Sequence, residues 1–287
     1  MNSALQPTPL VRGDAIRVFV GFRDADGRSS VGFVDVDRTN PSRVVGTSTK
    51  AGLHRGPRGS FDEDGVVPTA IVEQGAGLRL YYAGYQRGLD VRFRAFGGLA
   101  LSDDGGETFH RHGREPVMGP SAEGEFFRVP HTVMPGPDCW RVWYGAGSEW
   151  RKGRDKTLPV YNIRYLESPD GIEFSAAGEV AIPLSEGEYR IGRPYVVRNS
   201  YGYAMYFAAA TETRGFRLAF ATSSDGRHWA RRDAEIRLGP SPGSWDSEMV
   251  SYPAVVTTEG RTFLFYNGND YGRAGFGYAE LEKDETG

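Results

Sequence analysis

The chain has 287 residues with 39 glycines and an aromatic content of 13%, which fits one large all-β domain. A net charge of −3 argues against a broadly basic, nucleic-acid-binding surface, and the single cysteine, Cys139, leaves no disulfide framework and no cysteine-based zinc site. The first residues lack the apolar run of a secretory signal, and no segment is long and apolar enough to span a bilayer. We therefore expect a cytoplasmic protein without nucleic-acid or membrane partners.

One sequence phrase recurs about every sixty residues along the whole chain. It consists of a proline, a short apolar run, a glycine-containing turn and an aromatic strand that ends in small residues. The aromatic strand occurs at 18–21, 80–84, 142–145, 204–208 and 264–268. The prolines keep nearly the same spacing at Pro68, Pro130, Pro194 and Pro253, with Pro7 or Pro9 as a weaker first copy. Five copies predict a single domain, 1–287, that folds as a five-bladed β-propeller.

The third copy shows how one blade is built. Apolar residues 132–134 are followed by turn residues 135–138 and by the aromatic strand, and a third strand is expected at 160–166. A tight turn at 168–171 leads into the fourth strand, so each blade should have four antiparallel strands. The last copy ends near 279–281 with three clear strands, unless the N-terminus supplies another.

A Ser-x-Asp-Gly turn followed by an aromatic residue recurs at 102–109, 168–174 and 223–229. Its Asp and Ser side chains can bond the backbone amides of the turn, and Gly can take the positive φ angle. A row of aspartates also invites a metal-binding or catalytic interpretation. The structural interpretation is strongly preferred, because the motif follows the blades and suits a hairpin.

Charged segments lead into the later prolines, at 61–68, 125–131, 188–194 and 245–253. If the innermost strand of each blade begins just after its proline, these segments share one end of the central axis. They would aim six carboxylates towards one funnel: Asp62, Asp64, Glu125, Glu188, Asp246 and Glu248. Acid/base cleavage of a glycosidic bond requires such a convergence, with one carboxyl group protonated and another ionised.

A structural role remains open for some of these acids. Asp62 and Asp246 each follow an aromatic residue and fit equally well as braces at a junction between blades. Glu188 and Glu248 favour function, because each is followed by extended backbone rather than by turn residues. The predicted catalytic residues are thus Glu188 and Glu248 as acid/base groups, with Asp62 or Asp64 as a base or a pKa-tuning group.

Many arginines and lysines fall in the loops at this same end, which suggests an anionic ligand such as a phosphate, nucleotide or carboxylate. Most of them could equally pair with nearby acids as solvated loop charges. Arg128 and Arg193 differ because they lie close to the proline of an axial strand, and His131 is placed to reach the axis, although a purely structural histidine fits as well. The predicted ligand-binding residues are Arg128, His131, Arg193, Tyr252, Asp246, Arg55 and Asp270.

Three of these features together resemble the five-bladed propeller glycosidases, a superfamily that includes arabinanases and xylosidases, invertases and levansucrases, and mannoside phosphorylases. They are Phe61-Asp62-x-x-Gly65-Val66-x-Pro68 followed by the strand at 80–84, the Ser-x-Asp-Gly turns, and Trp245-Asp246-x-Glu248-Met249. The resemblance covers nearly the whole chain. It implies three acidic residues around the funnel, and in some members a calcium or other ion on the axis.

The chain also departs from that pattern. The first copy lacks an early Asp-Pro element, no Arg-Asp-Pro triplet occurs, and Arg193-Pro194 stands where the resemblance would place Glu-Gly-Pro. The acidic triad therefore cannot be transferred residue by residue. No metal site or cofactor is predicted beyond the axial calcium that the resemblance would allow.

The leading hypothesis is a glycoside hydrolase-like enzyme that acts on a glycosidic or sugar-like bond of an anionic small molecule. Two alternatives stay open. One is a non-catalytic propeller that binds a ligand or partner through its arginine-rich face. The other is a biosynthetic cyclase, lyase or epimerase that uses the same funnel.

Overall fold

The computed structural model describes residues 3–88, 91–174 and 177–282. Over these residues the fold is nearly all β, which confirms the all-β part of the predicted fold class. The helical segments of this part of the chain are the 3-10 turn η1 (Asp233–Glu235) and the single-turn helix α1 (Asn269–Gly272). Neither is long and apolar enough to cross a membrane.

The strands follow one another in five groups, each built by antiparallel pairing of chain neighbours. Group 1 consists of β1 (Ser3–Arg12), β2 (Ala15–Arg23), β3 (Ser29–Asp37) and β4 (Val44–Thr47). Group 2 consists of β5 (Gly65–Gln74), β6 (Gly77–Gln86), β7 (Arg94–Ser102) and β8 (His110–Arg111). Group 3 consists of β9 (Phe127–Met134), β10 (Trp140–Lys152), β11 (Thr157–Ser168) and β12 (Glu179–Ile182).

Group 4 consists of β13 (Glu188–Asn199), β14 (Gly202–Thr211), β15 (Arg214–Ser223) and β16 (Ala230–Arg231). Group 5 has three strands, β17 (Ser251–Thr258), β18 (Arg261–Asn267) and β19 (Phe276–Leu281). The recurring aromatic strand is the second strand of every group. Its large side chains are buried in the core, among them Phe19, Tyr81, Trp143, Phe207 and Phe265.

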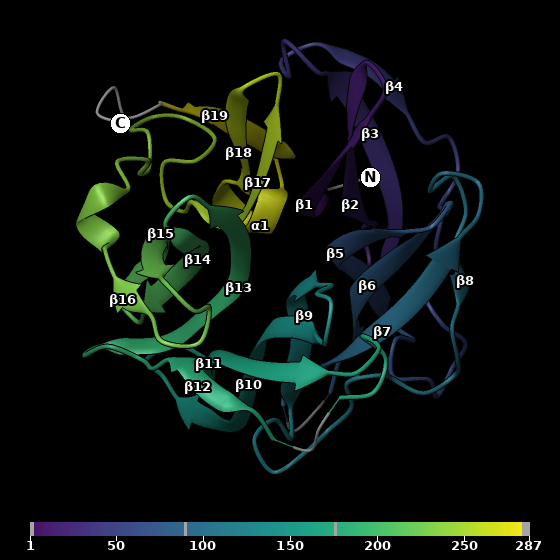
Figure 1. Ribbon diagram of the computed structural model, residues 1–287. Helices are drawn as coiled ribbons and strands as arrows, with labels where there is room; N and C mark the ends of the chain where they lie inside the picture. The colour runs from purple at the N-terminus through teal and green to yellow at the C-terminus, as the bar shows by residue number, and fades with distance from the viewer. Residues whose placement is uncertain (1–2, 89–90, 175–176, 283–287) are drawn as a thin grey trace.

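The groups are arranged around a common centre, with β1, β5, β9, β13 and β17 innermost (Figure 1). Short parallel bridges join group 1 to group 2, group 2 to group 3, and group 3 to group 4. Group 5 forms a separate three-stranded sheet, so the strand pairing among the described residues does not close into a ring. The count of five propeller blades stays a prediction.

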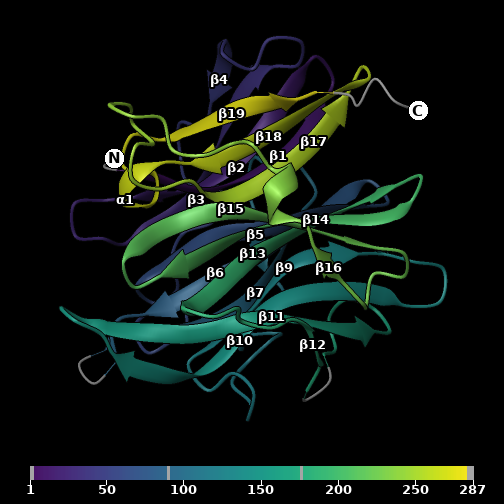
Figure 2. The same cartoon turned by 90° about the vertical axis from the view of Figure 1, so that its left-hand side faces the viewer.

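The first and last groups meet through β1, which packs against β17 and β18. The side chain of Asn267 on β18 accepts a hydrogen bond from the backbone N–H of Gln6 at 2.8 Å and donates one to the carbonyl oxygen of Ala4 at 2.8 Å. Figure 2 shows the beginning of β1 and α1 at the same end of the molecule. The N-terminal strand thus belongs to group 1 and adds no fourth strand to group 5 in the described part of the chain.

The recurring prolines lie inside the innermost strands, and the prediction that each strand begins after its proline is wrong. Every innermost strand has a register shift at its proline: Pro7, Pro68, Pro130, Pro194 and Pro253. Proline has no N–H to donate to a strand ladder, so it is tolerated where a bulge interrupts the pairing. The bulge leaves the residues beside each proline free to project towards the centre.

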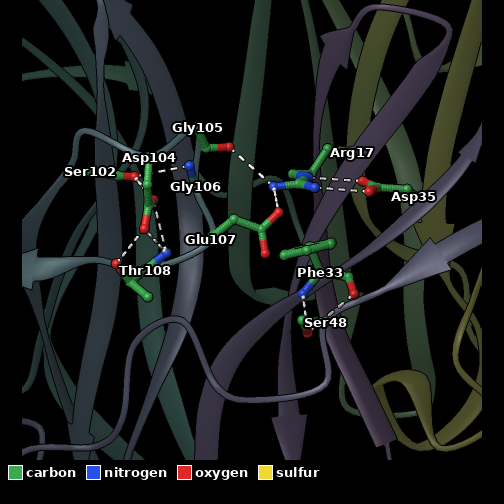
Figure 3. Close-up of polar contacts among 10 residues, drawn as sticks. All are labelled: Arg17, Phe33, Asp35, Ser48, Ser102, Asp104, Gly105, Gly106, Glu107 and Thr108. Atoms are coloured by element: carbon green, nitrogen blue, oxygen red, sulfur yellow. Dashed lines mark hydrogen bonds and ion pairs between the residues drawn. The ribbon is translucent and has the colours of Figure 1, made fainter.

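The Ser-x-Asp-Gly turns are held by their own side chains, as the structural interpretation predicts. In the first turn, Ser102 Oγ accepts from the Gly106 N–H at 2.9 Å, and Asp104 accepts from the N–H and hydroxyl of Thr108 at 3.0 and 2.6 Å. Gly105 and Gly106 have φ angles of 76° and 86°, which non-glycine residues rarely adopt. The carbonyl oxygen of Gly105 accepts from Arg17 of group 1 at 3.1 Å, so the turn also docks one group on another (Figure 3).

Candidate functional site

A cavity of about 400 Å³ lies at the centre, and all five strand groups contribute to its wall. The lining is rich in cations and phenols. The cationic and imidazole side chains are Arg23, Arg87, Arg92, Arg190, Arg193 and His131, and the phenols are Tyr85, Tyr161, Tyr252 and Tyr271. Among residues 3–88, 91–174 and 177–282, no aspartate or glutamate lines this cavity. Its electrostatic character is therefore strongly positive.

Arg193 lies deepest among these cations, with only 2% of its surface exposed. Its guanidinium donates hydrogen bonds to the carbonyl oxygens of Thr69 and Pro7, the latter at 3.0 Å, and to Thr8 Oγ1 at 2.9 Å. It thereby ties β13 to β1 and β5. Burial lowers the pKa of Arg193 to about 10, although the neighbouring Tyr195 and Tyr252 act in the opposite direction. Among the described residues it has no carboxylate partner.

Three residues that immediately precede a central proline have positive φ angles: Gln6, Arg193 and Tyr252. All three line the cavity. A non-glycine residue in this region of φ/ψ space is strained, and such strain concentrates at functional sites. The backbone at the centre is therefore held in a conformation that turns these side chains inward.

His131 follows the central proline of β9 and is 3% exposed. Its ring stacks at 6.4 Å from that of Phe127, and its Nδ1 has no hydrogen-bond partner among the described residues. Burial, and secondarily the charge of Arg193, lowers the pKa of His131 well below its ordinary value. The structure thus places His131, Arg193 and Tyr252 in the cavity wall at the predicted axis. Their ligand-binding roles stay predictions.

A second constellation, formed by Arg190 and Tyr271, is absent from the sequence-based prediction. Arg190 on β13 donates a hydrogen bond through Nη2 to the phenolic oxygen of Tyr271 at 2.8 Å, and its guanidinium lies 4.2 Å from the centre of the Phe216 ring. Burial would raise the pKa of Tyr271, but the charge and hydrogen bond of Arg190, helped by Lys156 and Arg92, lower it below its ordinary value.

The carboxylate of Asp62 is part of a structural brace between a connecting segment and an aromatic strand. It is 1% exposed and accepts two hydrogen bonds from Arg111, at 2.8 and 2.7 Å. It also accepts from Tyr82 at 3.3 Å and from Ser60 at 2.7 Å. The guanidinium of Arg111 lies 5.9 Å from the Tyr82 ring centre. These contacts match the structural alternative considered for Asp62.

The same acid–arginine–aromatic brace recurs in group 3, where it uses Glu123, a residue that the sequence analysis missed. Glu123 accepts from Arg128 Nε at 3.0 Å, from Arg164 at 3.0 Å and from the Tyr144 hydroxyl at 2.7 Å. Arg128 is paired with this buried acid and does not line the cavity, and its predicted role in ligand binding stays a prediction. Glu125 of the same segment is exposed, and its backbone N–H donates a hydrogen bond to the hydroxyl of Ser148.

Group 4 builds its brace from Glu188, whose two oxygens accept from Arg231 at 2.9 and 3.0 Å. Arg231 lies 5.3 Å from the ring centre of Phe207, at the position equivalent to Tyr82 and Tyr144. In group 5, Asp246 is 1% exposed and accepts from the hydroxyl of Tyr266 at 3.0 Å. These braces hold the acidic side chains against the aromatic strands and outside the cavity lining.

The remaining predicted residues lie apart from one another. Asp64 pairs with Arg87 at 3.1 Å and with Arg28 at 3.7 Å. Glu248 is exposed. Its backbone N–H donates to the side-chain oxygen of Asn269, and its carbonyl oxygen accepts from Arg217.

Arg55 is exposed and donates to the carbonyl oxygen of Glu63, while Asp270 is exposed and pairs with Arg273 at 3.3 Å. The cavity lining contains none of the residues Asp64, Glu248, Arg55 and Asp270, and it also lacks Asp62, Glu188 and Asp246. The structure therefore does not bring the four predicted catalytic carboxylates together around it. Their catalytic roles stay predictions. The described residues also contain no cluster of three or more His, Cys, Asp and Glu side chains that could hold a metal ion.

Comparison with known proteins places the chain among related sequences. No family model matches it. It is 35% identical over 284 residues to the uncharacterised protein Rv1502 of Mycobacterium tuberculosis strain H37Rv, a match that covers 98% of this chain and 93% of that protein. The uncharacterised protein MT1551 of the CDC 1551 strain is 34% identical with the same coverage.

Solved structures show the same fold at low sequence identity. A glycoside hydrolase is 16% identical with a TM-score of 0.75 and covers 97% of this chain and 86% of its own. A thermostable family-43 glycoside hydrolase is 13% identical with a TM-score of 0.71 and coverages of 99% and 91%. The β-1,2-mannobiose phosphorylase of Listeria innocua is 10% identical with a TM-score of 0.71 and coverages of 98% and 89%. The chain therefore belongs to the family of Rv1502 and MT1551, and its fold is that of these glycoside hydrolase and phosphorylase structures.

Proposed function

We propose that this protein is an enzyme that binds an anionic, sugar-like small molecule in the central cavity and acts on it there. The proposal takes the five strand groups as the blades of a propeller and the cavity as its funnel. The observation that carries it is the excess of cations in the lining, which no described carboxylate in that lining balances.

Unpartnered polar atoms around the cavity support the proposal. Five of the buried side-chain atoms without a hydrogen-bond partner in the described residues belong to its wall: Gln6 Oε1, Arg23 Nε, His131 Nδ1, Arg190 Nε and Arg193 Nε. Buried polar groups are nearly always satisfied in native proteins, so a cluster of exceptions calls for a missing partner. An anionic ligand rich in oxygen atoms would supply acceptors for four of them.

The ion pairs of the lining arginines also support an anionic ligand. Of the five lining arginines, only Arg87 has an ion-pair partner among the described residues. Taking a guanidinium out of water without an anion costs several kcal/mol, and charge-assisted hydrogen bonds to a carboxylate or phosphate recover much of that cost. The fold is that of enzymes named for sugar substrates, and the cavity wall offers the aromatic surfaces of Phe93, Phe127 and Phe216 beside its polar groups.

The lining also distinguishes among the reaction classes considered from the sequence. Hydrolysis by a carboxylate pair requires two acids that flank the scissile bond, about 5–5.5 Å apart for retention or 6.5–9.5 Å for inversion. In the described part of the chain the cavity offers phenols and an imidazole in their place. This favours the lyase, epimerase or cyclase alternative over a carboxylate-based hydrolase.

Calorimetric titration with glucuronate, glucose 6-phosphate and glucose tests the proposal. We expect the two anionic sugars to bind and glucose to bind at least about tenfold more weakly, because it lacks the charge-assisted hydrogen bonds. Arg92→Gln removes an exposed lining cation and should weaken binding of the anionic sugars, whereas Arg94→Gln, an exposed arginine two residues away and outside the lining, should not. Equal affinity for glucose and glucuronate, or no effect of Arg92→Gln, would refute the proposal.

A further inference from the structure

Tyr271 and its neighbours form an arrangement suited to proton transfer, an inference that rests on the proposed function of the cavity. Tyr271 lies in α1, where Asp270 and Tyr271 both have positive φ angles, 53° and 57°. Strained backbone at non-glycine residues persists only where surrounding contacts impose it. Here the side-chain oxygen of Asn269 accepts from the backbone N–H groups of Glu248 and Met249 at 2.8 and 3.1 Å, and the backbone N–H of Asn269 donates to the carbonyl oxygen of Trp245 at 3.0 Å.

The phenol of Tyr271 is thereby held in the cavity wall against a cation. Arg190 donates to its oxygen, and the Arg190 guanidinium is fixed by the rings of Phe216 and Tyr189, at 4.2 and 5.1 Å. A guanidinium that donates to a phenolic oxygen stabilises the phenolate more than the neutral phenol. The pKa of Tyr271 is lowered accordingly.

Two other phenols of the same cavity are shifted in the opposite direction. Burial raises the pKa of Tyr161 to about 12, and burial together with nearby phenols raises the pKa of Tyr252. The rings of Tyr252 and Tyr271 are 6.3 Å apart between centroids. When neighbouring titratable groups are shifted apart in this way, the group with the lowered pKa is suited to be the base and the other to be the acid.

We propose that Tyr271 is the general base of this cavity and that it removes the proton from the ring carbon bearing the carboxylate of a bound uronate-type sugar. The lining arginines hold that carboxylate and stabilise the negative charge that develops on it as the C–H bond breaks. The catalysed reaction is then a β-elimination rather than a hydrolysis.

The electrons and protons of this step balance without a further reactant. The pair released from the C–H bond forms a double bond to the adjacent ring carbon, and the bond from that carbon to the glycosidic oxygen breaks. The departing oxygen takes a proton from Tyr252, and the proton held by Tyr271 returns to Tyr252 through solvent. One glycoside thus becomes an unsaturated uronate and an alcohol, with no oxidant, reductant or water consumed.

The experiment follows the reaction of the full-length protein with two probes. Glucuronate in D₂O reports exchange of the proton beside the carboxylate by NMR, and digalacturonate reports elimination by the ultraviolet absorbance of the unsaturated product. We expect Tyr271→Phe to slow both by about 100-fold or more, while glucuronate binding persists. Tyr206→Phe, which removes a phenol of β14 outside the cavity lining, should change neither rate.

The outcomes separate this inference from the proposed function. Glucuronate binding without exchange in the wild-type protein, or exchange that survives in Tyr271→Phe, would overturn the role of Tyr271 and leave the anion site intact. Failure of both anionic sugars to bind would overturn the proposed function itself, and the inference with it. Tyr252→Phe offers a second variant, which should slow elimination and spare exchange; the reverse pattern would overturn the assignment of acid and base.

Discussion

The brace at Asp62 leads to an asymmetric prediction for its two partners. Arg111→Met leaves a carboxylate that is 1% exposed without its cation, whereas Asp62→Ala leaves a guanidinium that is 24% exposed and can turn towards water. Removing one partner of a buried ion pair costs about 3–5 kcal/mol when the remaining charge stays buried. We therefore expect Arg111→Met to cost that much. Asp62→Ala should cost less, about 1–3 kcal/mol for the lost hydrogen bonds.

Urea unfolding followed by tryptophan fluorescence measures both values, and the double variant completes the cycle. Because the two residues act as a unit, the double variant should cost clearly less than the sum of the single variants. At a urea dependence near 3 kcal/mol per molar, the loss in Arg111→Met corresponds to a midpoint lower by about 1 M or more. A larger loss for Asp62→Ala than for Arg111→Met, or additive losses, would refute the brace. Unchanged binding of anionic sugars by the folded double variant would further separate the brace from the cavity.

Three other predictions concern residues at or near the centre. Glu188→Gln should destabilise the protein, because it weakens the ion pair with Arg231. Binding of anionic sugars, measured by calorimetry, should stay unchanged. Loss of binding without loss of stability would instead indicate that Glu188 acts in the cavity. His131 is buried, and its pKa lies well below its ordinary value. As pH falls below about 6.5, the unfolded chain therefore takes up a proton that the folded protein does not. The free energy of unfolding should then fall by about 1.4 kcal/mol per pH unit until the pKa of the folded state is reached. His131→Gln should remove this one-proton slope from urea-unfolding data collected between pH 7 and 5, and an unchanged slope would contradict the buried neutral imidazole. Asn267→Ala removes bonds to Gln6, Ala4 and Gly275 and should cost about 3 kcal/mol in the same assay, whereas a cost near zero would show that β1 is held to group 5 by packing alone.

Much of the fold could be predicted because it depends on short sequence motifs that repeat along the chain. The aromatic strands, the Ser-x-Asp-Gly turns and the spacing of the copies each depend on residues that are close together in the chain. The exact place of the prolines could not be predicted, because a bulge depends on how two strands register. Pro68, for example, lies in the middle of β5 rather than before it.

The candidate site was harder to predict, because its contacts join distant residues. The sequence presents Asp62 and Glu188 as free acids beside an axial strand, but their partners, Arg111 and Arg231, lie on the outermost strands of their groups. The Arg190–Tyr271 pair spans 81 positions and depends on two residues with positive φ. No local signal in the sequence marks either feature. His131 and Arg193 could be placed on the axis because the repeat itself locates them beside the central prolines.

Arg193 has a consequence for how this repeat protein holds together. In repeat proteins that stack in a line, each repeat contacts only its neighbours and stability is roughly a sum over repeats. Here one guanidinium joins β13 to backbone oxygens 124 and 186 positions earlier in the chain. The groups should therefore unfold cooperatively rather than one by one, and a fragment that ends before this residue would lack the central tie. Two of its three acceptors are backbone oxygens, so this tie depends on the arginine side chain and on the path of the backbone at Pro7 and Thr69.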